Sequence, residues 1–318
     1  MDEIKQYGNQ SLYSHILFEF KHGVPNGDYL LTESHGYFDD VDIIAQTIIK
    51  AMSPTIKKAI LYGEKKEIDR TFTREDFSFD VFFDNLTLHL TFIPSETTDY
   101  YGGFNFRNTK VTHLEDGTLS YHPYISLTCQ AKILPDAVHT LYFALGHELT
   151  HAHSELEAAK GNGGWLQKSE KYAKSILFKE LSGVDRHVRV ISHAMYVLDR
   201  RERNAFIAQL KQELETHKDE ILDSKSATET ITKTESYKDS YLFLTQVAHW
   251  LINTKFSDEE QDDICQVMSK ITNKAFNTLS DVIKYIVLHA KKWQKEYEIR
   301  ASKIAYDIFA EDGLAMLF

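Results

Sequence analysis

The sequence predicts an α+β protein with a mostly antiparallel sheet, one long histidine-bearing helix and a helical C-terminal part. Apolar and polar residues alternate between positions 77 and 92, which is typical of strands. Apolar residues return every three or four positions between 138 and 156, and again in several stretches between 237 and 318, which is typical of helices that bury one face. Strands are therefore expected before the histidine-bearing helix and helices after it.

The first elements are expected to be a helix and a β-hairpin. Residues 39 to 52 carry an apolar stripe at helical spacing, and Pro54 is expected to end that helix. In the hairpin, phenylalanines alternate through 77 to 83, Asp84-Asn85 makes the turn, and leucines alternate through 86 to 92. Side chains with such regular spacing are expected in the core.

The next elements lead to the histidine-bearing helix. Residues 100 to 106 combine aromatic residues with glycine and are expected to form a packed loop. Residues 124 to 129 are a predicted strand, and the helix is predicted to begin at Pro135-Asp136 and to stop at the glycines 161 to 164. Its core-facing stripe contains Leu141, Leu145, Leu149, Ala152 and Leu156.

Residues 147 to 151 read His-Glu-Leu-Thr-His, which is an H-E-x-x-H motif. On a helix, His147 and His151 lie one turn apart, so their ring nitrogens can bind one zinc ion at about 2.0 to 2.1 Å. Both lie outside the leucine stripe and are therefore expected to face a cleft. Glu148 lies beside them, where it can take a proton from a metal-bound water without being a ligand. The motif thus predicts a Zn²⁺ site with Glu148 as the catalytic base.

A third ligand has to come from elsewhere, because a catalytic zinc ion has three protein ligands and an open position for water. The first candidate is Glu202, on a second predicted helix that begins near Asp199. A capping box between Asp199 and Glu202 accounts for the same two residues without a metal. Glu157, six residues after the second histidine, and Glu180 remain alternatives.

These residues carry a family resemblance. An H-E-x-x-H helix followed by an E-x-x-A-x-x-A helix (Glu202, Ala205, Ala208) resembles the gluzincin group of zinc metalloproteases. The resemblance implies a zincin-like fold, a Zn²⁺ cofactor, hydrolysis of peptide bonds, and Glu202 as the third ligand. Phe206 stands where many members have an aspartate. A weaker similarity is to bacterial effector proteases of the NleD type, whose motif also runs H-E-L-x-H-A. The resemblance covers residues 137 to 210.

Composition restricts the partners. The 318 residues carry a formal net charge of −11, so nucleic acid is not an expected partner. Cys129 and Cys265 have no metal-binding spacing and exclude a disulfide framework, which favours a reducing compartment. The N-terminus has no signal-peptide pattern, and no apolar run approaches a membrane span. We expect a protein or peptide substrate, no membrane association, and a location in the cytoplasm or export as an effector without a cleaved signal peptide. The sequence leaves the oligomeric state open.

Two domains are expected, a zincin-like catalytic domain at 1 to 222 and a helical subdomain at 237 to 318. Residues 223 to 230 are expected to form a linker or long loop between them, and the acidic residues 257 to 263 a solvated connector. A tyrosine or histidine is expected to stabilise an oxyanion. The sequence does not choose among His187, His193, Tyr172 and Tyr196. The competing interpretation is a zincin-like binding or regulatory protein without turnover.

Overall fold

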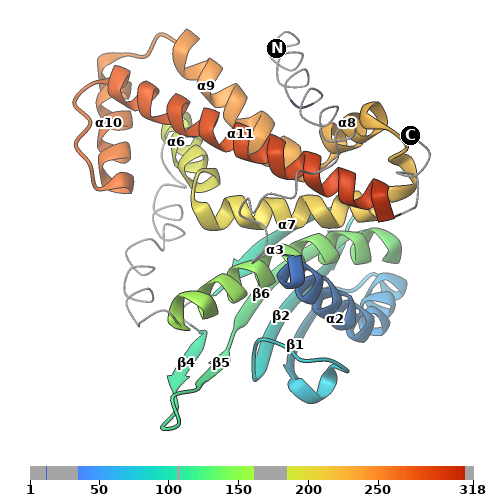
Figure 1. The fold of residues 1–318 in the computed structure, drawn as a ribbon. Helices are drawn as coiled ribbons and strands as arrows, with labels where there is room; N and C mark the ends of the chain where they lie inside the picture. The colour runs from blue at the N-terminus through green and yellow to red at the C-terminus, as the bar shows by residue number, and fades with distance from the viewer. Residues whose placement is uncertain (1–11, 13–34, 106–107, 161–184, 312–318) are drawn as a thin grey trace. The chain divides into compact units, whose positions relative to one another are not determined.

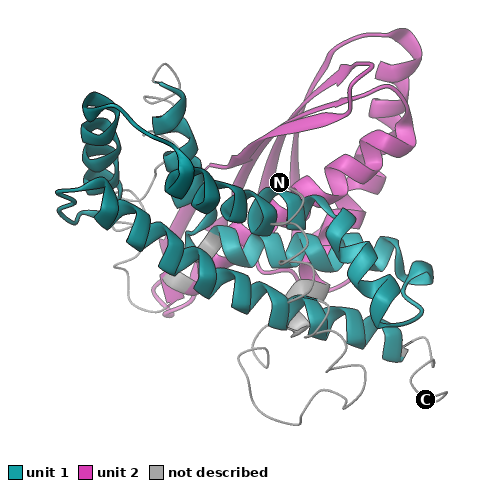
Figure 2. Cartoon of the chain, turned by 90° about the horizontal axis from the view of Figure 1, so that it is seen from above, with its two compact units in different colours: residues 1–27, 169–318 teal, residues 28–168 magenta. Residues whose placement is uncertain are grey.

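A computed structural model describes residues 12, 35–105, 108–160 and 185–311. The chain divides into two compact units, coloured separately in Figure 2. Unit 1 comprises residues 1–27 and 169–318, and unit 2 comprises residues 28–168. The interval 223 to 236, where the sequence predicts the domain boundary, lies within unit 1.

Unit 2 contains a four-stranded sheet with the strand order β1-β2-β6-β3. Figure 1 labels β1, β2 and β6 of this sheet. These strands are β1 (Lys66–Thr73), β2 (Asn85–Pro94), β3 (Asp99–Phe104) and β6 (Tyr124–Ala131). β1 pairs antiparallel with β2, and β3 pairs antiparallel with β6, whereas β2 and β6 run parallel. A separate hairpin joins β4 (Lys110–His113) to β5 (Leu119–His122). The expected α+β class with a mostly antiparallel sheet is confirmed, and β3 is an edge strand.

Two long helices pack side by side on this sheet (Figure 1). α2 (His35–Tyr62) contacts β1 and β2, and α3 (Leu134–Lys160) contacts β3 and β6. Every second residue of β2 and β6 is buried, so one face of the sheet meets the apolar stripes of the helices. The predicted strand at 124 to 129 and the predicted histidine-bearing helix are confirmed as β6 and α3.

The prediction that Pro54 ends the first helix is wrong. α2 continues through Pro54 to Tyr62. A proline removes one backbone N–H from the helix, but the buried Ile56 and Ala59 continue the apolar stripe beyond it. The Ser53 hydroxyl also donates to the Ile49 carbonyl at 2.7 Å. Burial of the next two turns therefore outweighs the hydrogen bond lost at the proline.

The predicted hairpin is half right. Its second strand is β2, but β2 pairs with residues 66–73, in the register that places Thr73 opposite Asn85. The phenylalanines at 77 to 83 belong to the connection between β1 and β2, where Phe77 and Phe83 are buried as expected. β1 is hard to recognise because charged residues occupy much of its exposed face. The spacing of the phenylalanines indicated burial and not a strand.

The prediction of a loop at 100 to 106 is also wrong, because β3 occupies 99–104. The strand approaches β6 so closely that a Cβ atom at Gly102 would clash with the Ser126 carbonyl oxygen. Gly102 also has a φ of +142°, which L side chains rarely adopt. Glycine thus permits the close pairing of this edge strand.

Within its described residues, unit 1 is built from helices, which confirms the predicted helical C-terminal part. Its α-helices are α6 (Arg186–Val197), α7 (Arg200–Thr216), α8 (Ser224–Lys233), α9 (Phe243–Asn253), α10 (Asp258–Thr272) and α11 (Leu279–Glu311). Trp293 and Tyr297 of α11 are fully buried. No helix of the described part of the chain has the length and apolar character needed to span a membrane.

Two segments of unit 1 differ from the sequence predictions. The predicted linker at 223 to 230 is mostly α8, because Asp223 accepts hydrogen bonds from the backbone N–H groups of Lys225 and Ser226 and caps the helix. Ala227 and Ile231 are buried along it. The predicted acidic connector is the beginning of α10, capped by Ser257. Polar composition suggested loops in both places, whereas the capping residues and a buried stripe make helices.

Candidate metal centre

α3 is held firmly in unit 2. Its leucine stripe is buried in the core, and the Tyr121 hydroxyl of β5 donates to the Ala152 carbonyl of α3 at 2.7 Å. On another side, the Tyr142 hydroxyl of α3 donates to the Asp42 carboxylate of α2. The helix that carries the motif is therefore fixed by both apolar packing and side-chain hydrogen bonds.

His147 and His151 lie next to each other on α3. Their ring centroids are 4.9 Å apart with 75° between the ring planes. Both side chains are buried, at 6% and 7% exposure. Two neighbouring imidazoles on a rigid helix provide two nitrogen donors for one metal ion.

Glu148 is directed at the edge strand. Its Oε2 atom accepts a hydrogen bond of 2.6 Å from the backbone N–H of Phe104, the last residue of β3. A Cβ atom at Gly103 would lie 3.7 Å from the same oxygen. A short hydrogen bond to a carboxylate is strong and directional, so it orients this buried side chain. The candidate base is thus placed beside an exposed strand edge.

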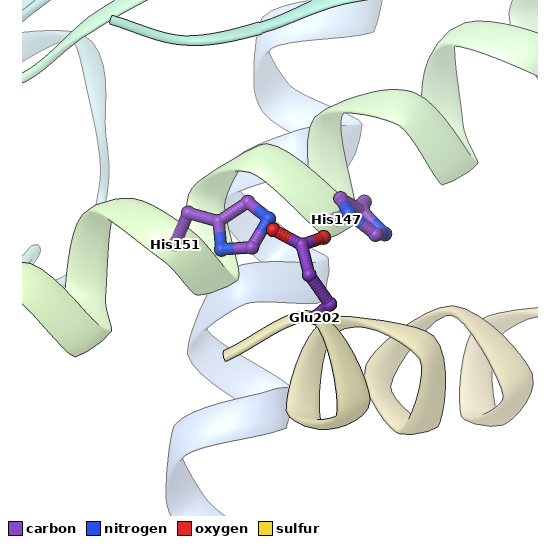
Figure 3. Close-up of side chains that lie close together, drawn as sticks. All are labelled: His147, His151 and Glu202. Atoms are coloured by element: carbon purple, nitrogen blue, oxygen red, sulfur yellow. The ribbon is translucent and has the colours of Figure 1, made fainter. Parts of the chain in front are cut away.

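Glu202 lies in the first turn of α7, in unit 1, and is half-buried. The same turn is attached to α11, because Arg203 binds Glu296 at 2.5 Å and Arg300 donates to Asn204 at 3.0 Å. Figure 3 shows the side chains of Glu202 on α7 and of His147 and His151 on α3. Since the histidines belong to unit 2, their sharing of an ion with Glu202 is part of the function proposed below.

Glu157 and Glu180 are the two alternative candidates for the third ligand. Glu157 is exposed, and its carboxylate binds the Lys160 ammonium at 2.7 Å. Six residues of an α-helix turn through about 600°, so Glu157 projects about 120° away from His151. Glu180 lies outside the described residues, as does Tyr172. Glu157 is therefore occupied on another side of α3.

Two further residues of α3 matter. His153 packs edge-on against Phe82, with ring centroids 5.0 Å apart, and burial lowers its pKa to about 4, so its ring is neutral at pH 7. Glu155, only 1% exposed, was missed at the sequence level. It follows His151 by one turn, and a ligating histidine usually donates its second N–H to a carboxylate. The continuation of the i, i+4 spacing to Glu155 was the available signal.

The structure separates the oxyanion candidates of unit 1. His187 lies against α10, with its Nε2 atom 3.6 Å from Asp263. His193 stacks on Tyr196 at a centroid distance of 5.8 Å and lies within electrostatic range of Glu202. Burial lowers the pKa of His193, and the Glu202 charge opposes that shift. Of the described candidates, His193 therefore interacts electrostatically with Glu202, and Tyr196 stacks on His193.

Comparison of the chain with protein-family models, with curated proteins and with solved structures yields no match. The resemblance to gluzincins therefore remains a prediction that depends on the motif residues.

Proposed function

We propose that this protein is a zinc-dependent peptidase in which His147, His151 and Glu202 bind the metal and Glu148 is the general base. The observation that carries the proposal is the arrangement on α3. Two buried imidazoles lie one turn apart, and the carboxylate between them in sequence is held by the backbone of an edge strand.

The proposed donor set fits a catalytic zinc ion. Two imidazoles and one carboxylate are a known ligand combination for hydrolytic zinc, and they leave a fourth position for water. His147, His151 and Glu202 form a candidate group of three metal-binding side chains. Bound zinc would lower the pKa of a coordinated water to about 7.

Glu148 would receive the proton of the attacking water and pass it to the leaving amine. The hydrogen bond from Phe104 would keep the carboxylate in one orientation through both transfers. In this proposal Glu148 is not a ligand.

The substrate would be an extended polypeptide. β3 is an edge strand, and such an edge can bind a peptide as an additional strand through backbone hydrogen bonds. Because Phe104 ends β3 and contacts Glu148, a peptide on this edge would pass beside the base. This position favours hydrolysis of a backbone amide within the bound strand.

The test combines metal analysis with hydrolysis of a peptide mixture followed by mass spectrometry. Wild type should bind zinc and cleave peptides. Glu148→Gln should keep its zinc and lose activity by about 10³-fold, because an amide cannot accept the proton. Glu157→Gln, an exposed substitution on the same helix, is the matched control and should remain active. An active Glu148→Gln variant contradicts the mechanism, and a zinc-loaded but inactive wild type favours a binding protein.

A further inference from the structure

A second group of potential ligands lies wholly within unit 1. It consists of Asp185, His187 and Asp263, and one oxygen or nitrogen of each lies within 4.8 Å of the others. Asp185 and His187 are at the start of α6, and Asp263 is in the second turn of α10. The two helices pack against each other.

His187 is a buried side chain with one ring nitrogen that makes no hydrogen bond to the described residues. Its side chain is 7% exposed, and its Nε2 atom has no hydrogen-bond partner among the described residues. The nearest carboxylate oxygen, Oδ2 of Asp263, is 3.6 Å away. A buried polar nitrogen without a hydrogen bond is costly, so its position beside the Asp263 carboxylate requires an explanation.

The 3.6 Å separation agrees with two atoms that bind the same ion. Ligands about 2.0 to 2.2 Å from a tetrahedral zinc ion lie about 3.3 to 3.6 Å from each other. An N–H to O hydrogen bond would instead be about 2.9 Å long. The spacing is therefore too long for a direct hydrogen bond and suitable for a shared metal.

The carboxylates near His187 are not committed elsewhere in a way that excludes a metal. Asp185 occupies the N-cap position of α6, but its side chain makes no capping hydrogen bond. Glu260 has one oxygen in the capping box of α10, where it accepts from the Ser257 N–H at 2.7 Å, and its other oxygen lies 3.8 Å from His187 Nδ1. Three carboxylates thus surround one imidazole, and within the described residues no Lys or Arg forms an ion pair with any of them.

We infer that Asp185, His187 and Asp263 form a second site, which binds a divalent transition-metal ion such as zinc and ties the beginning of α6 to α10. One imidazole and two carboxylates are a mixed nitrogen and oxygen donor set, which suits zinc better than the all-oxygen ions calcium and magnesium. Asp185 is exposed and Asp263 is half-exposed, so an ion can enter from solvent.

The test is zinc titration of the full chain after removal of metal, with calorimetry and with the absorption spectrum of Co²⁺ as a second probe. Wild type should bind two ions, and Asp263→Asn should lose one of them or bind it at least tenfold more weakly. Asp262→Asn, which alters the adjacent exposed acid, should behave as wild type. His147→Ala should lose the other ion, which separates this inference from the proposed peptidase site.

Asp263 is half-exposed, so its replacement by the isosteric asparagine should leave the fold intact, as checked by circular dichroism. His187→Gln should give the same loss of one ion. Equal zinc uptake by wild type and Asp263→Asn would overturn the inference and leave a simple ion pair between His187 and Asp263. Loss of the only bound ion in Asp263→Asn, with His147→Ala unchanged, would support this site and refute the peptidase site.

Discussion

The two units place their candidate metal ligands by different means. In unit 2, His147 and His151 are four residues apart on α3, so the helix alone brings the rings within 4.9 Å of each other. In unit 1, His187 and Asp263 belong to different helices, and only the packing of α6 against α10 brings them to 3.6 Å. A local motif can therefore be recognised in a sequence, whereas a group assembled by packing has no such pattern.

Each unit holds a buried acid by hydrogen bonds from backbone N–H groups. Glu148 of unit 2 accepts a short hydrogen bond from a strand backbone. Glu213 of unit 1 is 4% exposed and accepts from the backbone N–H groups of Glu235 and Ser236 at 3.1 and 3.2 Å. Burial raises the pKa of Glu213 to about 7, against the opposing effect of these bonds. The helical unit therefore contains a core acid that titrates near neutral pH.

The largest effect is expected from the ligand that the proposal takes from unit 1. The binding free energy of zinc at a complete ligand set is about 10 to 16 kcal/mol. Glu202→Ala removes one of three ligands and should therefore weaken zinc binding by about 4 kcal/mol, which is roughly a thousandfold in affinity. Competition with a chelating dye measures this loss. Glu157→Ala is the control and should have no effect on affinity. Full zinc affinity in Glu202→Ala would limit the site to the ligands of unit 2.

Two neighbouring glycines of β3 test whether the edge strand depends on its close approach to β6. Gly102→Ala should destabilise unit 2 by about 3 kcal/mol, because its Cβ would meet the Ser126 carbonyl and its φ is positive. Gly103→Ala should be well tolerated, since its Cβ would make only an ordinary contact with Glu148. Hydrogen exchange of β6 and β3 amides reports the difference. Equal protection of these amides in the two variants would show that the stability of unit 2 does not depend on the close approach of β3 to β6.

A smaller effect is expected on folding stability, which should depend on pH in opposite directions in the two units. The folded-state pKa of Glu213 is raised from 4.5 to about 7, so folded unit 1 binds the proton more tightly than the unfolded chain does. Its stability should therefore fall as pH rises through this window, by about 2 kcal/mol between pH 5 and pH 8. Glu213→Gln should remove that decline, and the exposed Glu229→Gln should not. Hydrogen exchange resolved by unit measures both.

Asp84 provides the contrasting case in unit 2. Burial acts to raise its pKa, but hydrogen bonds from Ser120 and Tyr121, with the charge of Arg74, lower it overall. A lowered folded-state pKa stabilises the protein above the ordinary value of 3.8 and ceases to do so as pH falls through the folded value. Asp84→Asn should reduce the loss of unit 2 stability as pH falls below the ordinary carboxyl pKa. A profile that is unchanged would show that this cluster contributes little.

Several sequence predictions failed for one physical reason, namely that burial and capping overrode local composition. Pro54 suggested a helix end, yet the apolar stripe beyond it kept α2 intact. Residues 223 to 230 are polar and suggested a loop, yet Asp223 caps a helix there. The phenylalanines from 77 alternate but lie in a connection, and β2 pairs with β1 instead. The deciding contacts of α2 and β2 are with residues outside the local pattern, whereas the cap of α8 lies within it, between Asp223 and the backbone of Lys225 and Ser226.

By itself the sequence determined the helix with His147, Glu148 and His151, because side-chain directions on an α-helix follow from spacing alone. It also determined the α+β class, since strands and helices bury apolar residues with different periods. The partner of Glu148 on β3 and the meeting of His187 with Asp263 were decided only by tertiary structure. Strand pairing and helix packing join residues that are far apart in the chain, and the free energy that selects them comes from burying whole faces, which no short segment encodes.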